Sequence, residues 1–351
     1  MRAHKEIIPI LTVAIPTYNR CRTLEKILNQ LEKEKNQGFQ ILISDNNSSD
    51  DTELMVKTFQ KRVQNITYAR NTQNVGYSEN FLKLYEMAKT RYIWFLADDK
   101  TILPGAINNI LATLISCHPV VAVFNHYAVD PYGKKWISGV SRDILHSDIN
   151  KFHDYRQILK THFISIIVAE KRLSIDAIKG ADYKNNIFIQ LTLVLLLLSD
   201  KFLFCESAFP IVLRNSHSKY GEFFKFVFVD SLSAVFLINH KFDNNRFIRE
   251  SKKNIFWALQ LYLSQKLNYF KFHGRPSRET IKQIIRYHGL YSIFIACFPV
   301  LYYITPAFLL KFVYFIQLVK INGYKKAAII YNHNLNRVLK NKTSSGFINN
   351  R

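Results

Sequence analysis

Residues 11–20 read LTVAIPTYNR, a short apolar run that ends in a polar cluster. The same order returns in residues 40–50, QILISDNNSSD, and in residues 92–99, YIWFLADD. Residues 23–35 and 80–90 lie between these runs and carry apolar side chains at helical spacing. The inner face of the first helix is expected to hold Leu24, Ile27, Leu28 and Leu31. Apolar strands that alternate with helices predict a parallel sheet covered by helices on both faces.

The pattern continues less regularly along the rest of the chain. Residues 66–69 complete the first set of strands, and we expect further strands at 120–124, 165–168 and 209–213. Residues 187–198 form an apolar run that is too short to span a bilayer and is therefore expected to be a buried helix. Further helices are expected at 223–240, 245–267 and 277–287.

Polar clusters follow the expected strands, at 17–20, 45–50 and 98–99, where parallel sheets bind their ligands. The adjacent carboxylates of Asp98-Asp99 repel each other unless a cation lies beside them, and a Mg²⁺ or Mn²⁺ ion carrying a diphosphate would supply that charge. The alternative is that these acids only cap the next turn. Asp45 suits a hydrogen bond to a ribose or a base edge, and its alternative role is to form a local turn.

Composition excludes several classes of protein. Of the 351 residues, 48% are hydrophobic and 14% aromatic, too many for a disordered or fibrous chain. The four cysteines lie far apart, which argues against a zinc site or a disulfide framework and favours a reducing compartment. Residues 7–15 are apolar, but they contain Pro9 and lead into a polar motif without a cleavage site, so we expect a buried strand and no signal peptide.

The positive charge is concentrated in the last third of the chain. The 48 basic and 26 acidic residues give a net charge of +22, and residues 241–351 alone hold 19 basic and 3 acidic ones. Within that region, residues 289–310 are uncharged and rich in aromatic side chains. We therefore expect two parts, an α/β domain over residues 1–240 and a basic, helical C-terminal region over residues 241–351.

Four motifs keep the order and spacing found in the large family-two glycosyltransferases: IPTYNR at 15–20, ISDNNSSD at 43–50, NVG at 74–76, and the acid pair 98–99. The resemblance covers residues 10–115, and residues 160–220 are more weakly similar to the abequosyltransferase-like enzymes of O-antigen and capsule synthesis. It implies a GT-A fold, a Rossmann-like mixed sheet with helices on both faces. It also implies a nucleotide-diphosphate sugar donor, a Mn²⁺ or Mg²⁺ ion, and inversion at the anomeric carbon.

The resemblance also implies roles for single residues. The residues expected to line the base and ribose pocket are Pro16, Thr17, Tyr18, Arg20 and Asp45. Asn74 and Gly76 would border the donor, and Asp98 and Asp99 would hold ribose and metal. Many members show D-x-D-D at this point, whereas this chain has Leu96-Ala97-Asp98-Asp99, which leaves open which carboxylate contacts the metal.

Two further roles follow the same resemblance. Arg214 and His217 would lie in a loop that closes over the diphosphate, where an arginine can pair with two phosphate oxygens; the alternative is a solvated loop. An inverting transfer also needs a carboxylate base beside the acceptor hydroxyl. Asp182 is the residue expected in that role, ahead of Asp176 and Glu170, because it precedes the buried helix.

The C-terminal region suggests where the protein works. An uncharged aromatic stretch followed by lysines is typical of helices that lie in the interface of an anionic membrane, although a span or a buried hairpin would also fit. The expected partners are an anionic membrane surface and a lipid-linked saccharide at the cytoplasmic face of a bacterial inner membrane, with no nucleic acid. The competing hypothesis is a basic, non-enzymatic membrane- or nucleic-acid-binding protein on a degenerate GT-A scaffold.

Overall fold

The computed structural model describes residues 9–34, 38–129, 135–148, 163–179 and 189–215. Within them the strands are β1 Leu11–Thr17, β2 Phe39–Asp45, β3 Ile66–Arg70, β4 Tyr92–Phe95, β5 Thr101–Ile102, β6 Val121–Val129, β7 Lys135–Ser138, β8 Ile144–His146, β9 Ile167–Glu170 and β10 Phe204–Asn215. The helices are α1 Cys21–Glu32, α2 Thr52–Arg62, α3 Tyr77–Met87, α4 Ala106–Cys117, α6 Ile175–Lys179 and α7 Ile189–Asp200, with a 3-10 turn, η2, at Ile164–Ile166.

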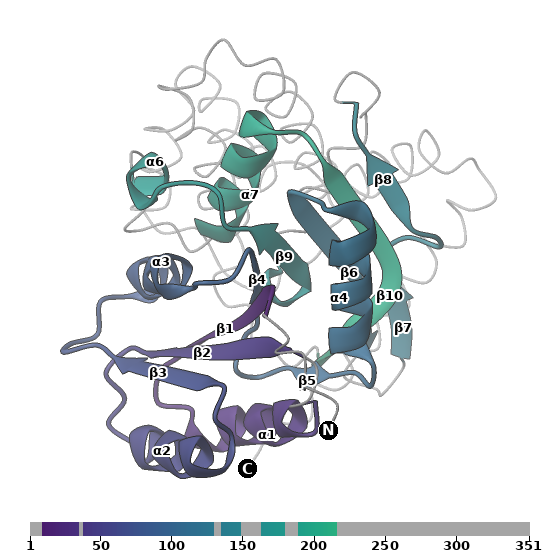
Figure 1. Ribbon diagram of the computed structural model, residues 1–351. Helices are drawn as coiled ribbons and strands as arrows, with labels where there is room; N and C mark the ends of the chain where they lie inside the picture. The colour runs from purple at the N-terminus through teal and green to yellow at the C-terminus, as the bar shows by residue number, and fades with distance from the viewer. Residues whose placement is uncertain (1–8, 35–37, 130–134, 149–162, 180–188, 216–351) are drawn as a thin grey trace, which may run out of the picture. The chain divides into compact units, whose positions relative to one another are not determined.

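These strands form one mixed sheet in the order β3-β2-β1-β4-β9-β6-β10-β5, with β7 beside β6 and β8 beside β10 (Figure 1). The first four strands in this order are parallel, as the sequence predicts. β9 is antiparallel to both of its neighbours, β4 and β6, so β6 runs in the same direction as β1 and β4. The carboxyl ends of β1 to β4, β6 and β10 therefore meet at one edge of the sheet, where β9 begins.

The connections explain which face each helix covers. The chain moves from β1 to β2 to β3 in one direction along the sheet and then returns to β4 on the other side of β1. Because such crossovers are right-handed, this reversal places α1 and α2 on one face and α3 on the other (Figure 1). The four residues expected on the inner face of α1 are all buried. From this strand order a ligand-binding crevice is expected between the ends of β1 and β4, the point at which open α/β sheets bind their ligands.

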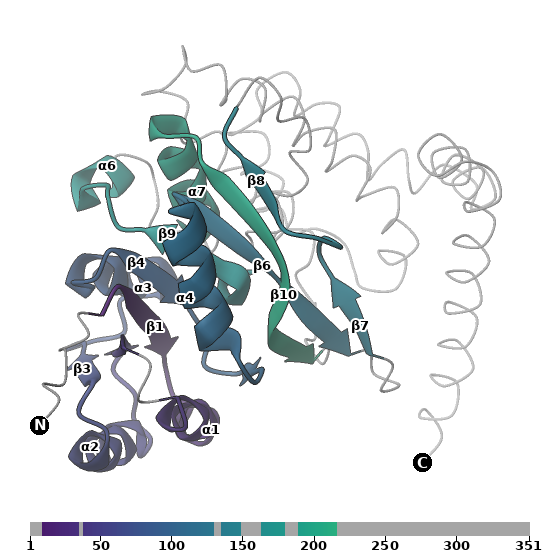
Figure 2. The same cartoon turned by 45° about the vertical axis from the view of Figure 1, so that its right-hand side comes forward.

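The second half of the sheet is built on β6 and β10, which run side by side with α4 packed against β10 (Figure 2). β10 begins five residues earlier than the strand predicted at 209–213. Its pairing with β6 is irregular around Pro210, which has no backbone N–H to donate. The expected strand thus covered only the part of β10 that begins next to this irregularity.

The buried helix expected at 187–198 corresponds to α7, whose residues from Ile189 to Leu198 are all buried. Among the described residues, no helix is both long and apolar enough to cross a membrane. The predicted boundary at 240/241, the basic helical C-terminal region and the uncharged stretch 289–310 lie outside the described residues.

Candidate active site

The crevice between β1 and β4 is bridged by side chains from both strand ends. Thr17 ends β1, and its hydroxyl donates a 2.8 Å hydrogen bond to Oδ2 of Asp98, three residues beyond β4. The backbone N–H of Ala97 donates to the Ser165 hydroxyl at 3.1 Å, which ties the loop after β4 to the segment that leads into β9. Asp98 is consequently held from two neighbouring strands and is only 6% exposed.

Two basic side chains lie against the acid pair. The Arg20 guanidinium is 3.2 Å from Oδ1 of Asp98 and 3.5 Å from Oδ2 of Asp99. Lys100 donates to the other oxygen of Asp99. Arg20, which the resemblance assigned to the base and ribose pocket, therefore lies at the acid pair. Two adjacent carboxylates are expected to have positive charge beside them. Arg20 and Lys100 supply part of that charge.

The two acids differ in their surroundings. Burial raises the pKa of Asp98 to about 6, and Asp99 adds to this rise, while Arg20 and the Thr17 hydroxyl oppose it. Asp99 is much more open, with 42% of its side chain exposed. Asp98 is thus a buried, hydrogen-bonded acceptor, and Asp99 is the carboxylate that an incoming ligand would meet first.

The acid pair fits a hard divalent cation in its chemistry. Carboxylate oxygens are the ligands that Mg²⁺ and Mn²⁺ prefer, and Mg²⁺ is commonly bound through one or two carboxylates with substrate phosphates and water. Within the described part of the chain, no group of three or more His, Cys, Asp or Glu side chains is placed to hold a metal. A cation here would therefore take its remaining ligands from the diphosphate and from water.

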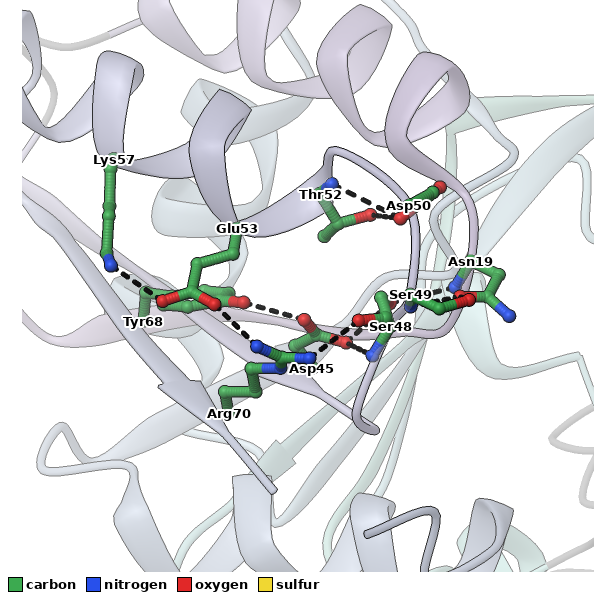
Figure 3. Close-up of polar contacts among 10 residues, drawn as sticks. All are labelled: Asn19, Asp45, Ser48, Ser49, Asp50, Thr52, Glu53, Lys57, Tyr68 and Arg70. Atoms are coloured by element: carbon green, nitrogen blue, oxygen red, sulfur yellow. Dashed lines mark hydrogen bonds and ion pairs between the residues drawn. The ribbon is translucent and has the colours of Figure 1, made fainter. Parts of the chain in front are cut away.

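Asp45 is placed differently from what its expected role would suggest. It ends β2 and is fully buried. Its Oδ1 accepts from the Ser48 hydroxyl at 2.6 Å and the Ser48 backbone N–H at 2.9 Å, and its Oδ2 accepts from the Tyr68 hydroxyl at 2.6 Å (Figure 3). Burial and the bond to Asp45 raise the pKa of Tyr68. In this arrangement Asp45 shapes the loop that follows β2.

The same loop is joined to its neighbours on both sides (Figure 3). Asn19 in the loop after β1 accepts from the Ser49 backbone N–H at 2.7 Å, and its own N–H donates to the Ser48 hydroxyl. Arg70 at the end of β3 donates to the Ser48 carbonyl at 2.8 Å and pairs with Glu53 of α2. The ends of β1, β2 and β3 are therefore fixed relative to one another.

Replacement of Asp45 by Ala is expected to lower the free energy of unfolding by about 3 kcal/mol, because three donors would lose a buried acceptor. Tyr68→Phe removes one of these bonds and is expected to cost about 1 kcal/mol. Thermal unfolding of the two variants beside the wild-type chain measures both effects. Equal stability of Asp45→Ala and wild type would contradict a loop held by this carboxylate.

An asparagine network positions the segment 74–76. The Asn46 amide donates to Oδ1 of Asn74 at 2.7 Å and accepts from the Val75 N–H at 2.9 Å and from the Asn71 side chain at 3.0 Å. Gly76 has a positive φ of 83°, and no atom lies within 4 Å of where a Cβ would be. Asn74 and Gly76 are exposed at the same edge as the acid pair, so the predicted donor segment faces open space.

The other predicted pocket residues divide by exposure. Tyr18 is 44% exposed, so its ring is accessible to a ligand. Pro16 lies within β1, opposite Ser44 of β2, and is half-buried. Thr17 is buried, and its hydroxyl already donates a hydrogen bond to Asp98. Tyr18 is therefore the one of these three side chains that can present a surface to a nucleotide base.

Arg214, near the end of β10, and Lys100, which adjoins Asp99, both lie near one aromatic ring, that of Phe163. The Phe163 ring lies 5.4 Å from the Arg214 guanidinium carbon and 5.8 Å from the Lys100 ammonium nitrogen. The His126 ring of β6 packs edge-on against it at 4.8 Å. Lys100 could have been noticed because it adjoins Asp99, but no local signal marks Phe163, Ser165 or His126.

The candidates for the catalytic base do not all lie at this edge. Glu170 is aligned with Tyr92, at the start of β4, and pairs with Arg91 at 2.9 Å. It is therefore at the opposite edge of the sheet, and its candidacy as base was wrong. Asp176 is exposed on α6. Asp182 and His217 lie outside the described residues, so their roles stay predictions.

Comparison with known proteins finds similarity to glycosyltransferases. Residues 12–169 match the family model described as Glycosyl transferase family 2. The chain is 35% identical over 106 residues to the GalNAc(5)-diNAcBac-PP-undecaprenol beta-1,3-glucosyltransferase of Campylobacter jejuni, which covers 30% of this chain and 34% of that protein. It is also 35% identical over 101 residues to the abequosyltransferase RfbV of Salmonella typhimurium, covering 28% and 30%. The matches thus span about a third of these curated relatives.

Solved structures show the fold at lower identity. S. aureus TarS 1-349 in complex with UDP-GlcNAc superposes with a TM-score of 0.54 at 13% identity, covering 79% of this chain and 80% of that one. The mannosyltransferase PcManGT from Pyrobaculum calidifontis, in complex with GDP-Man and Mn2+, gives 0.50 at 13% identity, covering 92% and 86%. The mixed α/β sheet has the GT-A fold, and residues 12–169, somewhat under half of the chain, are similar to glycosyl transferase family 2.

Proposed function

We propose that this protein is an inverting glycosyltransferase that moves one sugar from a nucleotide-diphosphate sugar to a saccharide acceptor. The observation that carries the proposal is the Asp98-Asp99 pair, fixed at the β1/β4 crevice by the Thr17 hydroxyl. In a family 2 domain this crevice is where a nucleotide donor is expected. A structural acid pair would not need one carboxylate buried and hydrogen-bonded and the other left open to ligand.

The donor would lie along the edge formed by the strand ends. The exposed Tyr18 ring is placed to stack on the base, and Asn74 and Gly76 border the same edge. Asp45, with Pro16 and Thr17, shapes the pocket floor through the loop bonds described above. Asp98 is placed to accept a ribose hydroxyl, because it is buried and already ordered by Thr17 and Arg20.

The leaving group would be held at the open side of the acid pair. Asp99 is the proposed principal ligand of a Mn²⁺ or Mg²⁺ ion, with Asp98 beside it, since Asp99 is the exposed carboxylate. When bound, such an ion neutralises the charge of the diphosphate. Arg214 and His217 are proposed to face the same phosphates from the other half of the sheet.

The transfer itself needs a base. In the proposed step, the bond between the anomeric carbon and the diphosphate oxygen breaks and its electron pair stays with the diphosphate. The acceptor oxygen forms the new bond from the opposite face, which inverts the anomeric carbon, and its proton passes to a carboxylate. Asp182 is the proposed carboxylate. The Tyr77 hydroxyl donates to Gln190 of α7 at 3.4 Å, so the helix downstream of Asp182 contacts the helix that starts at the donor segment.

The acceptor is proposed to be a lipid-linked saccharide at the cytoplasmic face of a bacterial inner membrane, in surface polysaccharide synthesis. Two observations support this. One matched relative is named for a saccharide on undecaprenyl diphosphate, and another for abequose transfer. The chain itself ends in an uncharged aromatic stretch and a basic region, which together favour docking on anionic lipid.

The proposal is tested by titrating the purified full chain with a panel of nucleotide sugars and following its thermal unfolding with and without Mn²⁺. One donor is expected to raise the unfolding temperature, and the rise is expected to be larger with Mn²⁺, because binding to the folded state stabilises it. Incubation of that donor with lipid-linked acceptors then tests transfer. Failure of every nucleotide sugar to bind would contradict the proposed function.

Membrane docking makes a separate prediction. Changing Lys311, Lys320, Lys325 and Lys326 to Gln in the full chain is expected to reduce its co-sedimentation with vesicles that contain anionic lipid, since each lysine contributes about 1 kcal/mol near such a surface. The matched control changes four exposed lysines of the catalytic half, Lys26, Lys33, Lys61 and Lys89, to Gln. Equal loss in both variants would show a general charge effect and contradict a docking role for the C-terminal region.

A further inference from the structure

We propose that Lys100 and Arg214, which both contact the Phe163 ring, form a two-cation seat for the diphosphate of the donor, and that Lys100 takes part in the reaction in its own right. The inference rests on the proposed function and deepens it, because it assigns the charge that receives the leaving group to two residues of the chain from different halves of the sheet. Neither the family motifs nor the sequence pattern assign Lys100 a role.

The geometry places the two cations at one aromatic ring. The Lys100 ammonium nitrogen and the Arg214 guanidinium carbon lie 5.8 and 5.4 Å from the Phe163 ring centroid. Each distance is within the range at which a cation is attracted to the face of an aromatic ring. The His126 ring packs against Phe163 and limits its movement. The ring thus contacts both a residue that adjoins the acid pair and a residue near the end of β10.

With respect to the described residues, the Lys100 ammonium has more hydrogen-bonding capacity than Asp99 uses. Its ammonium carries three donors, and Asp99 takes one of them. A phenyl ring accepts no ordinary hydrogen bond, so contact with Phe163 leaves the other donors for phosphate oxygens. The side chain is only 15% exposed, which strengthens its interaction with an anion compared with a solvated lysine.

The charges around the acid pair favour an anion. Arg20 contacts both carboxylates of the Asp98-Asp99 pair and Lys100 pairs with Asp99, so these two cations balance the charge of the two acids. Arg214 adds a third cation at the ring that Lys100 also contacts. When the bond to the sugar breaks, the departing diphosphate gains a further negative charge, and cations already in place stabilise that charge without rearrangement.

A second contact between a basic side chain and a phenylalanine ring, that of Arg62 with Phe59, provides a matched control. Arg62 lies 4.1 Å from the Phe59 ring centroid and pairs with Glu32 at 3.3 Å, so it also combines a carboxylate and an aromatic ring. It lies at the end of α2, before β3 begins, away from the edge that holds the acid pair. Its side chain is 49% exposed. Loss of Arg62 removes the same kinds of contact without touching the proposed seat.

The test measures binding of nucleoside diphosphates and monophosphates to the full chain by calorimetry, at a fixed concentration of Mn²⁺. The probes are UDP, GDP, CDP and dTDP with their monophosphates, and the nucleoside that wild type binds is used for the variants. Lys100→Met and Arg214→Met are each expected to weaken diphosphate binding by about 10- to 100-fold, as for loss of a charged hydrogen bond. Monophosphate binding should change less than twofold, and Lys100→Arg should restore most of the loss. Arg62→Met should leave both affinities unchanged.

Other outcomes overturn the proposal in distinguishable ways. If wild type binds none of the eight nucleotides, the proposed function fails and the seat fails with it. If wild type binds a diphosphate and Lys100→Met binds it equally well, the seat alone is wrong. An equal loss of monophosphate and diphosphate affinity would also overturn the seat, because it would show a general effect on the pocket.

Discussion

Replacement of Asp99 by Asn is expected to lower kcat/KM for the nucleotide-sugar donor by about 10³-fold, with the larger part of the loss in kcat. The substitution keeps the shape of the side chain and removes its charge. Asp99 is the exposed acid of the pair, so a cation that neutralises the leaving diphosphate would lose its main ligand, and such electrostatic groups commonly contribute this much to the rate.

Initial rates at saturating and limiting donor, with Mn²⁺, Mg²⁺ or EDTA, measure this effect. Glu25→Gln is the control, because it removes one exposed carboxylate from α1 without changing the acid pair. Full transfer by Asp98→Asn and Asp99→Asn in the presence of EDTA would show that the acids do not act through a metal.

Replacement of Asp98 by Asn is expected to have two opposite effects, a loss of activity and a gain in stability at neutral pH. Burial raises the pKa of Asp98 from 3.8 to about 6, so the folded protein holds this proton more tightly than the unfolded chain does. Keeping Asp98 ionised then costs stability, and the cost grows as the pH rises from about 4 to 6 and is constant above. The shift corresponds to about 3 kcal/mol at pH 7.5.

Asn carries no charge to bury, so Asp98→Asn should unfold at a higher temperature than wild type at pH 7.5, and the difference should vanish near pH 4. Thermal unfolding of both proteins between pH 4 and 8 measures this dependence. Glu25→Gln is the control, because that carboxylate is exposed on α1 and its loss should give no such gain. A difference that does not change with pH would contradict a cost that comes from ionisation.

The sequence predicted the parallel half of the fold well because its signals are local. Each of the first four strands is a continuous apolar run next to a polar cluster, and the inner residues of α1 follow helical spacing. The predicted ends of helices and strands were less accurate next to a residue with unusual backbone geometry. α3 starts at Tyr77, three residues earlier than expected, because the positive φ of Gly76 directly precedes it.

The site was predicted in part, for a reason that follows from topology. Thr17 and Asp98 were identified from motifs, and the structure joins them. Phe163 and Ser165 could not be identified, because their contacts with Lys100 and Ala97 depend on β9 entering the sheet antiparallel between β4 and β6. Nothing within a window of sequence encodes that pairing. The contact of Arg20 with both acids could not be predicted either. Arg20 follows β1 and the acids follow β4, and the local sequence does not show that these two strand ends are adjacent.

The short strand β9 has a consequence for how the molecule opens. It joins the two halves of the sheet through three aligned residue pairs on each side, with Tyr92, Ile93 and Trp94 in β4 and with Val121, Ala122 and Val123 in β6. Cooperative units of a protein separate where few backbone bonds hold them. Native-state hydrogen exchange should therefore find β1 to β4 and β6 with β10 as distinct foldons, with the amides of Ile167 to Glu170 at the seam. A fluctuation of that seam would change the separation of Asp99 and Arg214 while each half stays folded.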